Sequence, residues 1–133
     1  MKPSLQELLY WGQEYEKHRG FFQRFTEKLP KLIEQAGIPS LELIAVVPPS
    51  QIRVRFLGKD LMIDHEFVEA NRGTSLLTSS TIDRVDEKKR YQVAKMEMDN
   101  MGNVRLGPNL PVQHIDQNPD VVLYVFLVGI PKS

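Results

Sequence analysis

Small and apolar residues recur at helical spacing along the first third of the chain, but they form two stripes that point in different directions. At 100° per residue, one group clusters on one side of a helix: Leu5, Leu8, Leu9, Gly12 and Tyr15. A second group is rotated from the first by roughly 100°: Phe22, Phe25, Leu29, Leu32, Ile33 and Ala36. One straight helix cannot bury both stripes against the same surface, so this segment must bend or serve two surfaces.

Capping residues mark the two ends of this helical region. Ser4 stands at the N-cap position with Glu7 three residues later, as in a capping box, and Gly37 follows the last apolar residue as a C-cap does. An unbroken helix between them would be about 50 Å long, which is longer than a compact domain of this size. We therefore expect a kink or a break at Gly20 or Pro30, because both residue types weaken a helix interior.

From residue 41 the pattern changes to short runs that predict β-strands. Residues 41–47 form an apolar run that ends before two prolines. Residues 51–57 and 61–67 alternate apolar with polar side chains, and a Gly58-Lys59 turn joins them as a hairpin.

The alternation also predicts the register of this hairpin. Pairing Phe56 with Leu61 keeps the apolar side chains on one face, with His65 among them. On the other face Arg53 then lies opposite Asp64, and the opposite charges agree with this register.

A second hairpin is predicted from residues 75–85 and 90–98, which flank the charged loop 86–89. The expected cross-strand pairs are Ile82 with Val93 and Arg84 with Tyr91. Turn-forming residues at 99–103 then reverse the chain into a short strand at 104–106. The strands therefore follow one another as an antiparallel meander.

The last part of the chain is less regular. Residues 107–117 contain two prolines and predict an irregular connection. Residues 118–130 start with Asn118-Pro119 and reach Gly129 as a helix would, but their β-branched and aromatic content also suits a buried strand. A helix is the preferred interpretation, and a strand is the alternative.

These patterns predict a single domain of the α+β class. Kinked or paired N-terminal helices pack on one face of an antiparallel β-meander of five to seven strands, and a C-terminal helix or buried strand completes the fold. The expected parts are a helical layer at 1–37, the sheet at 41–106, the irregular connection at 107–117 and the C-terminal element at 118–130.

Composition and charge narrow the classes of partner. The 133 residues include 17 basic and 17 acidic side chains, so no global field attracts nucleic acid or an anionic membrane. Cysteine is absent, which excludes disulfides, thiolate catalysis and Cys-ligated metals. The N-terminus has no signal-peptide pattern, so a cytoplasmic location is expected. The longest apolar run, at 121–130, has half the length of a membrane span.

His65 is the residue that invites a catalytic interpretation, because Asp64 and Glu66 flank it. In a strand, alternate side chains point to opposite faces, so these two carboxylates and the imidazole cannot converge on one proton or metal. A core histidine that hydrogen bonds to a neighbour is the preferred interpretation of His65, and a pocket ligand or base is the alternative.

No other constellation predicts catalysis or a cofactor. His114, Asp116 and Asp120 could converge in a loop, but no second histidine lies nearby to complete a usual metal site. The basic residues at 88–90 are diluted by neighbouring acids, which argues against nucleic-acid binding. Glycine-rich nucleotide motifs are also absent. We therefore assign no catalytic residue, metal or cofactor.

Six of the eleven aromatic residues lie between positions 10 and 25, and this surplus carries the functional hypothesis. We expect a protein that binds a protein partner or a second copy of itself, as a homodimer, without catalytic activity. The interface candidates are Tyr10, Trp11, Phe21 and Phe22. The alternative is an enzyme or small-molecule-binding protein with a pocket between helices and sheet, lined by His65 and Tyr91.

Overall fold

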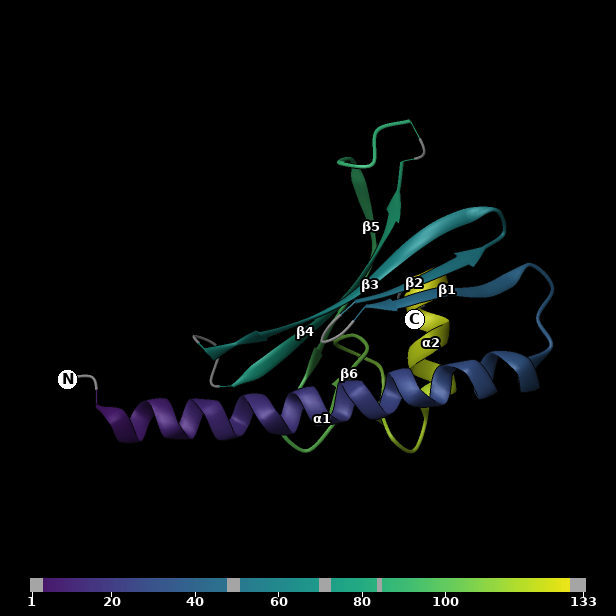
Figure 1. The fold of residues 1–133 in the computed structure, drawn as a ribbon. Helices are drawn as coiled ribbons and strands as arrows, with labels where there is room; N and C mark the ends of the chain where they lie inside the picture. The colour runs from purple at the N-terminus through teal and green to yellow at the C-terminus, as the bar shows by residue number, and fades with distance from the viewer. Residues whose placement is uncertain (1–3, 48–50, 70–72, 84, 130–133) are drawn as a thin grey trace.

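The fold is an antiparallel sheet with two helices, in the α+β class that the sequence predicts (Figure 1). The structure is a computed structural model and describes residues 4–47, 51–69, 73–83 and 85–129. The elements in chain order are α1 (Leu5–Ala36), β1 (Leu41–Val47), β2 (Gln51–Phe56), β3 (Lys59–Val68), β4 (Thr74–Ile82), β5 (Arg90–Met98), β6 (Asn103–Arg105), β7 (Gln113–His114) and α2 (Pro119–Val128).

The seven strands pair in their sequence order, each antiparallel to the next, so the sheet is a meander as expected. Both helices lie against the same face of this sheet, and they contact each other where the rings of Phe25 and Phe126 have centroids 5.9 Å apart. The other face carries charged and hydroxyl side chains, including an Arg55–Asp60 ion pair of 2.8 Å. One-sided burial explains why the strands alternate apolar with polar residues.

The α1 helix is continuous, so the predicted pair of N-terminal helices does not form. The backbone amide of Glu7 donates to the Ser4 side chain, and Gly37 ends the helix in the left-handed conformation. Pro30 lies inside the helix on its exposed face, while Leu29 on the buried face has no exposed surface. Packing of the residues around Pro30 therefore holds the helix together where local propensity would break it.

The β2–β3 hairpin forms two residues out of the predicted register. Phe56 pairs with Lys59 rather than with Leu61, because the two-residue turn is Leu57-Gly58 and not Gly58-Lys59. Both turn residues have positive φ, 53° and 76°, as a type I′ turn requires. A shift of two residues keeps every side chain on its predicted face, so the core is unchanged.

This shift replaces the expected charge pair across the hairpin. Arg53 lies opposite Met62 rather than Asp64, and the ion pair forms between Arg55 and Asp60. Arginines alternate along β2 and acidic residues recur along β3, so each of the two registers places an arginine opposite an aspartate. The charges alone therefore cannot distinguish the two registers.

The β4–β5 hairpin also departs from the predicted register. Ile82 pairs with Arg90 rather than with Val93, and a bulge interrupts the pairing after Ser79. The Asp83 carboxylate accepts backbone hydrogen bonds from two residues of the following loop, which ends the strand earlier than predicted. The expected pair of Arg84 with Tyr91 involves a residue outside the described part of the chain.

The C-terminal third adds one strand that the sequence did not predict. The short β7 lies within the segment expected to be irregular and pairs with β6. The preferred helix interpretation of residues 118–130 is confirmed by α2, which begins after Asn118 and ends before Gly129. Neither described helix has the length and apolar character needed to span a bilayer.

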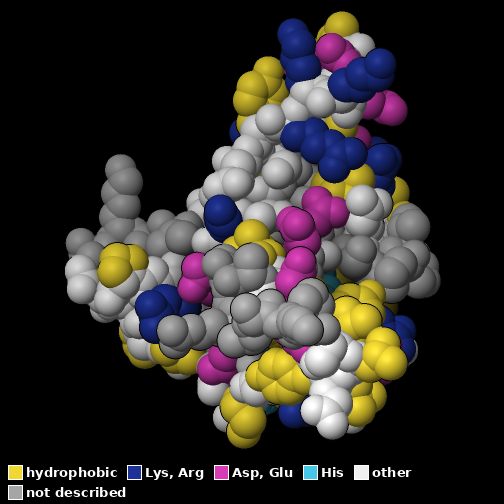
Figure 2. Space-filling model, turned by 90° about the vertical axis from the view of Figure 1, so that its left-hand side faces the viewer, with side chains coloured by type: hydrophobic (Ala, Val, Ile, Leu, Met, Phe, Trp, Pro, Cys, Tyr) yellow, Lys and Arg dark blue, Asp and Glu magenta, His cyan; other side chains and the backbone are white. Residues whose placement is uncertain are grey.

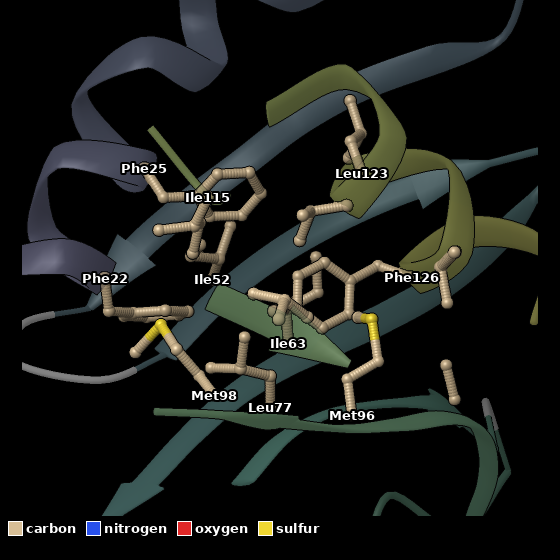
Figure 3. Close-up of a cluster of buried hydrophobic side chains, with 14 of the residues drawn as sticks. Phe22, Phe25, Ile52, Ile63, Leu77, Met96, Met98, Ile115, Leu123 and Phe126 are labelled. Atoms are coloured by element: carbon tan, nitrogen blue, oxygen red, sulfur yellow. The ribbon is translucent and has the colours of Figure 1, made fainter. Parts of the chain in front are cut away.

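The core lies between the sheet and the two helices (Figure 3). Side chains of α1 and α2 meet over the inner face of the central strands and are fully shielded from solvent. The residues with no exposed surface include Phe22, Phe25, Leu29, Ile52, Ile63, Leu77, Met98, Ile115, Val122 and Phe126.

Candidate functional site: the projecting end of α1

The first turns of α1 project beyond the sheet (Figure 1). Leu5, Leu8 and Leu9, which we call the leucine stripe, keep 82%, 66% and 62% of their surface exposed. Figure 2 views the molecule from this end, and hydrophobic side chains gather in its lower part. Burying one leucine fully is worth about 1.5–3 kcal/mol, so three exposed leucines together are an unusual cost for an isolated chain.

The phase of the helix explains this exposure. The leucine stripe is rotated by roughly 100° from the direction of Phe22, Phe25 and Leu29, which face the sheet. Since α1 is one continuous helix, docking the second stripe in the core leaves the first directed away from it. The two stripes of the helix therefore face two different surfaces. The sequence allowed either this outcome or a bend in the helix.

The leucine stripe ends at Gly12, which forms a notch in the helix surface. A Cβ atom added at Gly12 would meet nothing within 4 Å outside the helix backbone. Beyond the notch the same side of the helix becomes charged, with an exposed ion pair of 3.0 Å between Arg19 and Glu16. The apolar surface is therefore confined to the first two turns.

Tyr10 and Trp11, two of the interface candidates, follow the stripe in the sequence, but on the helix Tyr10 stands roughly 150° around from the stripe. Tyr10 is 49% exposed and its ring lies 5.0 Å from that of Trp11. Trp11 is half-buried, packs edge-on against Phe67 of β3 and lies over Gly73, which holds φ +72° at the start of β4. Trp11 thus anchors α1 to the β3–β4 hairpin, whereas Tyr10 remains accessible.

Phe21 and Phe22, the other two interface candidates, point into the molecule. Phe21 is half-buried, with its ring edge-on to His114 and beneath the guanidinium of Arg24. It also fills the space over Gly102, where an added Cβ would lie 2.6 Å from the ring. Phe22 has no exposed surface, so it belongs to the core rather than to the molecular surface.

A buried polar cluster joins α1 to the sheet just beyond Trp11. The Ser75 hydroxyl lies 2.8 Å from Nε2 of His65 and 2.7 Å from Nδ1 of His18, so one serine bridges two imidazoles. His18 and Ser75 have no exposed surface and His65 has 7%. Phe22 stacks on the His65 ring, with centroids 5.2 Å apart. We call these three bridged residues the His–Ser–His cluster.

Burial keeps both imidazoles of the cluster neutral near pH 7. It lowers the pKa of His65 to about 4, and the nearby His18 acts in the same direction. Burial also lowers the pKa of His18, while the backbone of Gly73 and the Glu14 carboxylate oppose that effect. A hydroxyl can donate to one neutral imidazole and accept from the other, so the bridge satisfies one nitrogen of each ring without charge, while the buried Nε2 of His18 has no hydrogen-bond partner.

The cluster does not form the pocket lined by His65 and Tyr91 that the sequence predicts as the alternative to a protein-binding surface. Tyr91 is 59% exposed and pairs with Thr81, whereas His65 pairs with Leu77. Those two positions of β4 are four residues apart, a distance of about 13 Å along the strand. The structure therefore does not bring Tyr91 and His65 together, and His65 is the hydrogen-bonded core histidine that the sequence favoured.

His114 and Asp116 are held by protein partners. His114 Nε2 lies 2.8 Å from the Met101 carbonyl, and its Nδ1 accepts from the backbone amide of Asp116. The Asp116 carboxylate pairs with Arg24 and Lys28 of α1. In the part of the chain that the structure describes, no three His, Asp or Glu side chains are grouped as a metal site.

At the other end of α1, an apolar groove runs between this helix and α2. Its volume is about 320 Å³, and among the described residues of its lining Asp120 is the one that carries a charge. Its apolar lining consists of Leu32, Ala36, Ile38, Phe56, Leu123, Tyr124, Leu127 and Val128. We call this the α1–α2 groove. Sequence reasoning missed it because its residues come from three separate segments.

The chain was compared with known protein families, curated proteins and solved structures. No protein-family model, no curated protein and no solved structure matches this chain.

Proposed function

We propose that this chain works by binding another protein chain, and that the leucine stripe is its binding surface. The observation that carries the proposal is the exposure of Leu5, Leu8 and Leu9 on one side of a well-formed helix. Apolar residues at positions i, i+3 and i+4 are the anchors by which an amphipathic helix docks into a groove.

The helix is also prepared for such docking. Trp11 and the His–Ser–His cluster attach α1 to the sheet just after the stripe, so the stripe continues a helix that is already anchored. A binding element that is already ordered does not lose conformational entropy on association. Tyr10 is also exposed, but it stands roughly 150° around the helix from the stripe, so the proposed surface does not include it.

A catalytic function at His65 has less support. Ser75 and His18 occupy its Nε2 side and Phe22 covers a ring face, so a substrate would have to displace the core to reach it.

Photo-crosslinking from the stripe tests the proposal. A benzophenone amino acid is introduced at position 8, and the matched control carries it at Gln13, an exposed polar position of the same helix. After irradiation of cells that express the variants, adducts are identified by mass spectrometry. We expect a defined protein adduct from position 8, with either this chain or another, and none above background from position 13.

Equal labelling from both positions, or no adduct from position 8, would contradict the proposal. Urea unfolding of both variants, followed by circular dichroism, checks that each retains the native fold.

A further inference from the structure

The two halves of α1 differ in the kind of side chain that they bury. Before Gly20 the buried residues are Glu14 and His18, which are both ionisable, whereas after Gly20 all the buried residues are apolar. We call residues 5–19 the N-terminal half of α1. Because this half buries ionisable groups, the strength of its attachment to the sheet depends on pH.

The N-terminal half is attached to the end of the β3–β4 hairpin, which lies beside it (Figure 1). The rings of Trp11, Tyr15 and His18 all stand edge-on to the same side chain, Phe67, with centroids 6.2, 5.9 and 5.1 Å from it. Ser75 adds the hydrogen bond to His18. No described residue of the apolar core comes from this half of the helix, so its detachment would leave the core intact.

The bridge in the His–Ser–His cluster fits two neutral imidazoles. The Ser75 hydroxyl has one hydrogen, so it donates to one ring and accepts from the other. A protonated imidazole donates from both nitrogens, but the buried Nε2 of His18 has no hydrogen-bond partner. A charged His18 would therefore hold an unpaired donor inside the docked structure, which favours a conformation where water reaches the ring.

Burial lowers the pKa of His18 despite the charges around it. Among the described residues, Glu14 and Asp99 favour protonated His18, and Lys17 disfavours it. Burial also lowers the pKa of His65 to about 4, and His18 adds to this effect. Both rings therefore bind a proton more tightly when the N-terminal half is detached than when it is docked.

Gly20 lies between the two halves and is the place where the helix can bend. Glycine is among the weakest helix formers, and a Cβ added at Gly20 would meet only the end of the Arg24 side chain. Phe21 follows directly and packs against His114 and Gly102, so the part of α1 that stays docked begins there.

We propose that the His–Ser–His cluster is an acid-sensitive switch: uptake of a proton detaches the N-terminal half of α1 from the β3–β4 hairpin, with Gly20 as the hinge, while the rest of the fold stays intact. Between pH 7.5 and pH 4.5, protonation of His65 alone raises the ratio of detached to docked molecules by up to roughly 70-fold. The switch does not depend on what the leucine stripe binds, because it consists of contacts within one chain.

Distances between spin labels on the full chain test this switch. The chain has no cysteine, so two introduced cysteines can be labelled selectively. The test pair is Gln13→Cys with Glu66→Cys, and the control pair is Gln35→Cys with Glu66→Cys, all at exposed positions. At pH 4.5 the test pair should gain a second, longer distance that is absent at pH 7.5, and the control pair should not. Trp11, the one tryptophan of the chain, should shift its emission to longer wavelength over the same range.

Variants that keep the hydrogen bonds but do not titrate show whether the cluster is the cause. His18→Asn/His65→Gln retains two side chains that can bond to Ser75, so it should stay docked at pH 4.5. His114→Gln, which changes the remaining histidine, is the matched control and should detach like the wild type. If the first variant is already detached at pH 7.5, His18→Phe/His65→Gln replaces it with the same expectation, because it keeps a ring against Phe67.

The inference fails if the test pair keeps its distance down to the pH at which circular dichroism shows loss of the fold. It also fails if both label pairs change together, or if both variants without titrating rings detach. None of these results changes the adduct expected from position 8, so the proposed function is tested separately.

Discussion

The two ends of α1 carry similar apolar residues but lie in opposite environments. Phe22, Phe25 and Leu29 have no exposed surface, whereas Leu5 and Leu8 are mostly in solvent. Both ends are helical, so the difference does not come from local conformation. It comes from the angle around the helix at which each stripe stands relative to the sheet. A single helix can thus stabilise the fold with one end and expose apolar side chains to solvent with the other.

The His–Ser–His cluster lies near the boundary between these two ends. Towards the C-terminus, Phe22, Phe25 and Leu29 of α1 belong to the apolar core, and towards the N-terminus Trp11 and Tyr15 pack edge-on against Phe67 of β3. The cluster is therefore a buried polar contact between two apolar parts of the attachment.

The largest expected difference between the two ends is in stability. Phe25→Ala should lower the free energy of unfolding by about 3–5 kcal/mol, because it opens a cavity beside Phe22 and Phe126. Leu8→Ala, measured at a concentration too low for association, should change it by less than about 0.5 kcal/mol. Urea unfolding of both variants gives the comparison. Similar losses at both positions would show that the projecting turns contribute to the fold as much as the core does.

Acid should lower the free energy of unfolding through the His–Ser–His cluster, which lies near the boundary between the two ends of α1. An unfolded histidine takes up a proton below pH 6.5, but folded His65 does so only near pH 4, so the unfolded state binds more protons between these values. Stability should therefore fall as the pH drops from about 6.5 to 4, by up to about 3 kcal/mol from His65, and His18 acts in the same direction.

Urea unfolding at a series of pH values measures this dependence. His65→Gln should flatten the slope between pH 6.5 and 4.5, while His114→Gln, outside the cluster, is the matched control and should keep it. An unchanged slope in His65→Gln would contradict burial as the cause.

The smallest expected effect concerns the two glycines inside α1. Alanine is favoured over glycine in a helix by about 1 kcal/mol. Gly20 lies beside the docked half, and an added Cβ would meet only the flexible Arg24 side chain at 3.4 Å. Gly20→Ala should therefore raise the free energy of unfolding by about 0.5–1 kcal/mol. Gly12→Ala should give a smaller gain, because the projecting turns can fray before the molecule unfolds. Equal gains would show that both ends unfold together.

Much of the fold was predictable because it rests on local patterns. Capping residues located both ends of α1, and alternation located the strands and assigned their inner faces. The registers of two hairpins were wrong because they depend on turn geometry. Leu57 adopts a left-handed conformation that leucine rarely takes, and nothing in the sequence pattern indicates it.

The candidate site was predictable only in part. The sequence located a surplus of aromatic side chains between positions 10 and 25, but Phe22 lies wholly in the core and the most exposed apolar side chains of α1 are the leucines that precede this surplus. The bridge between His18 and His65 joins residues 47 positions apart. Contacts of this kind leave no periodic signal.

By itself the sequence determined that two apolar stripes on one helix cannot share one surface, because the angle between residues on a helix is a constant of its geometry. Only the tertiary structure decided how that conflict is resolved. Packing of Phe25 and Leu29 in the core keeps α1 continuous through Gly20 and Pro30, and the stripe at the N-terminal end is left outside. Phe25 and Leu29 lose all of their exposed surface in this arrangement, and burying one such side chain fully is worth about 1.5–3 kcal/mol.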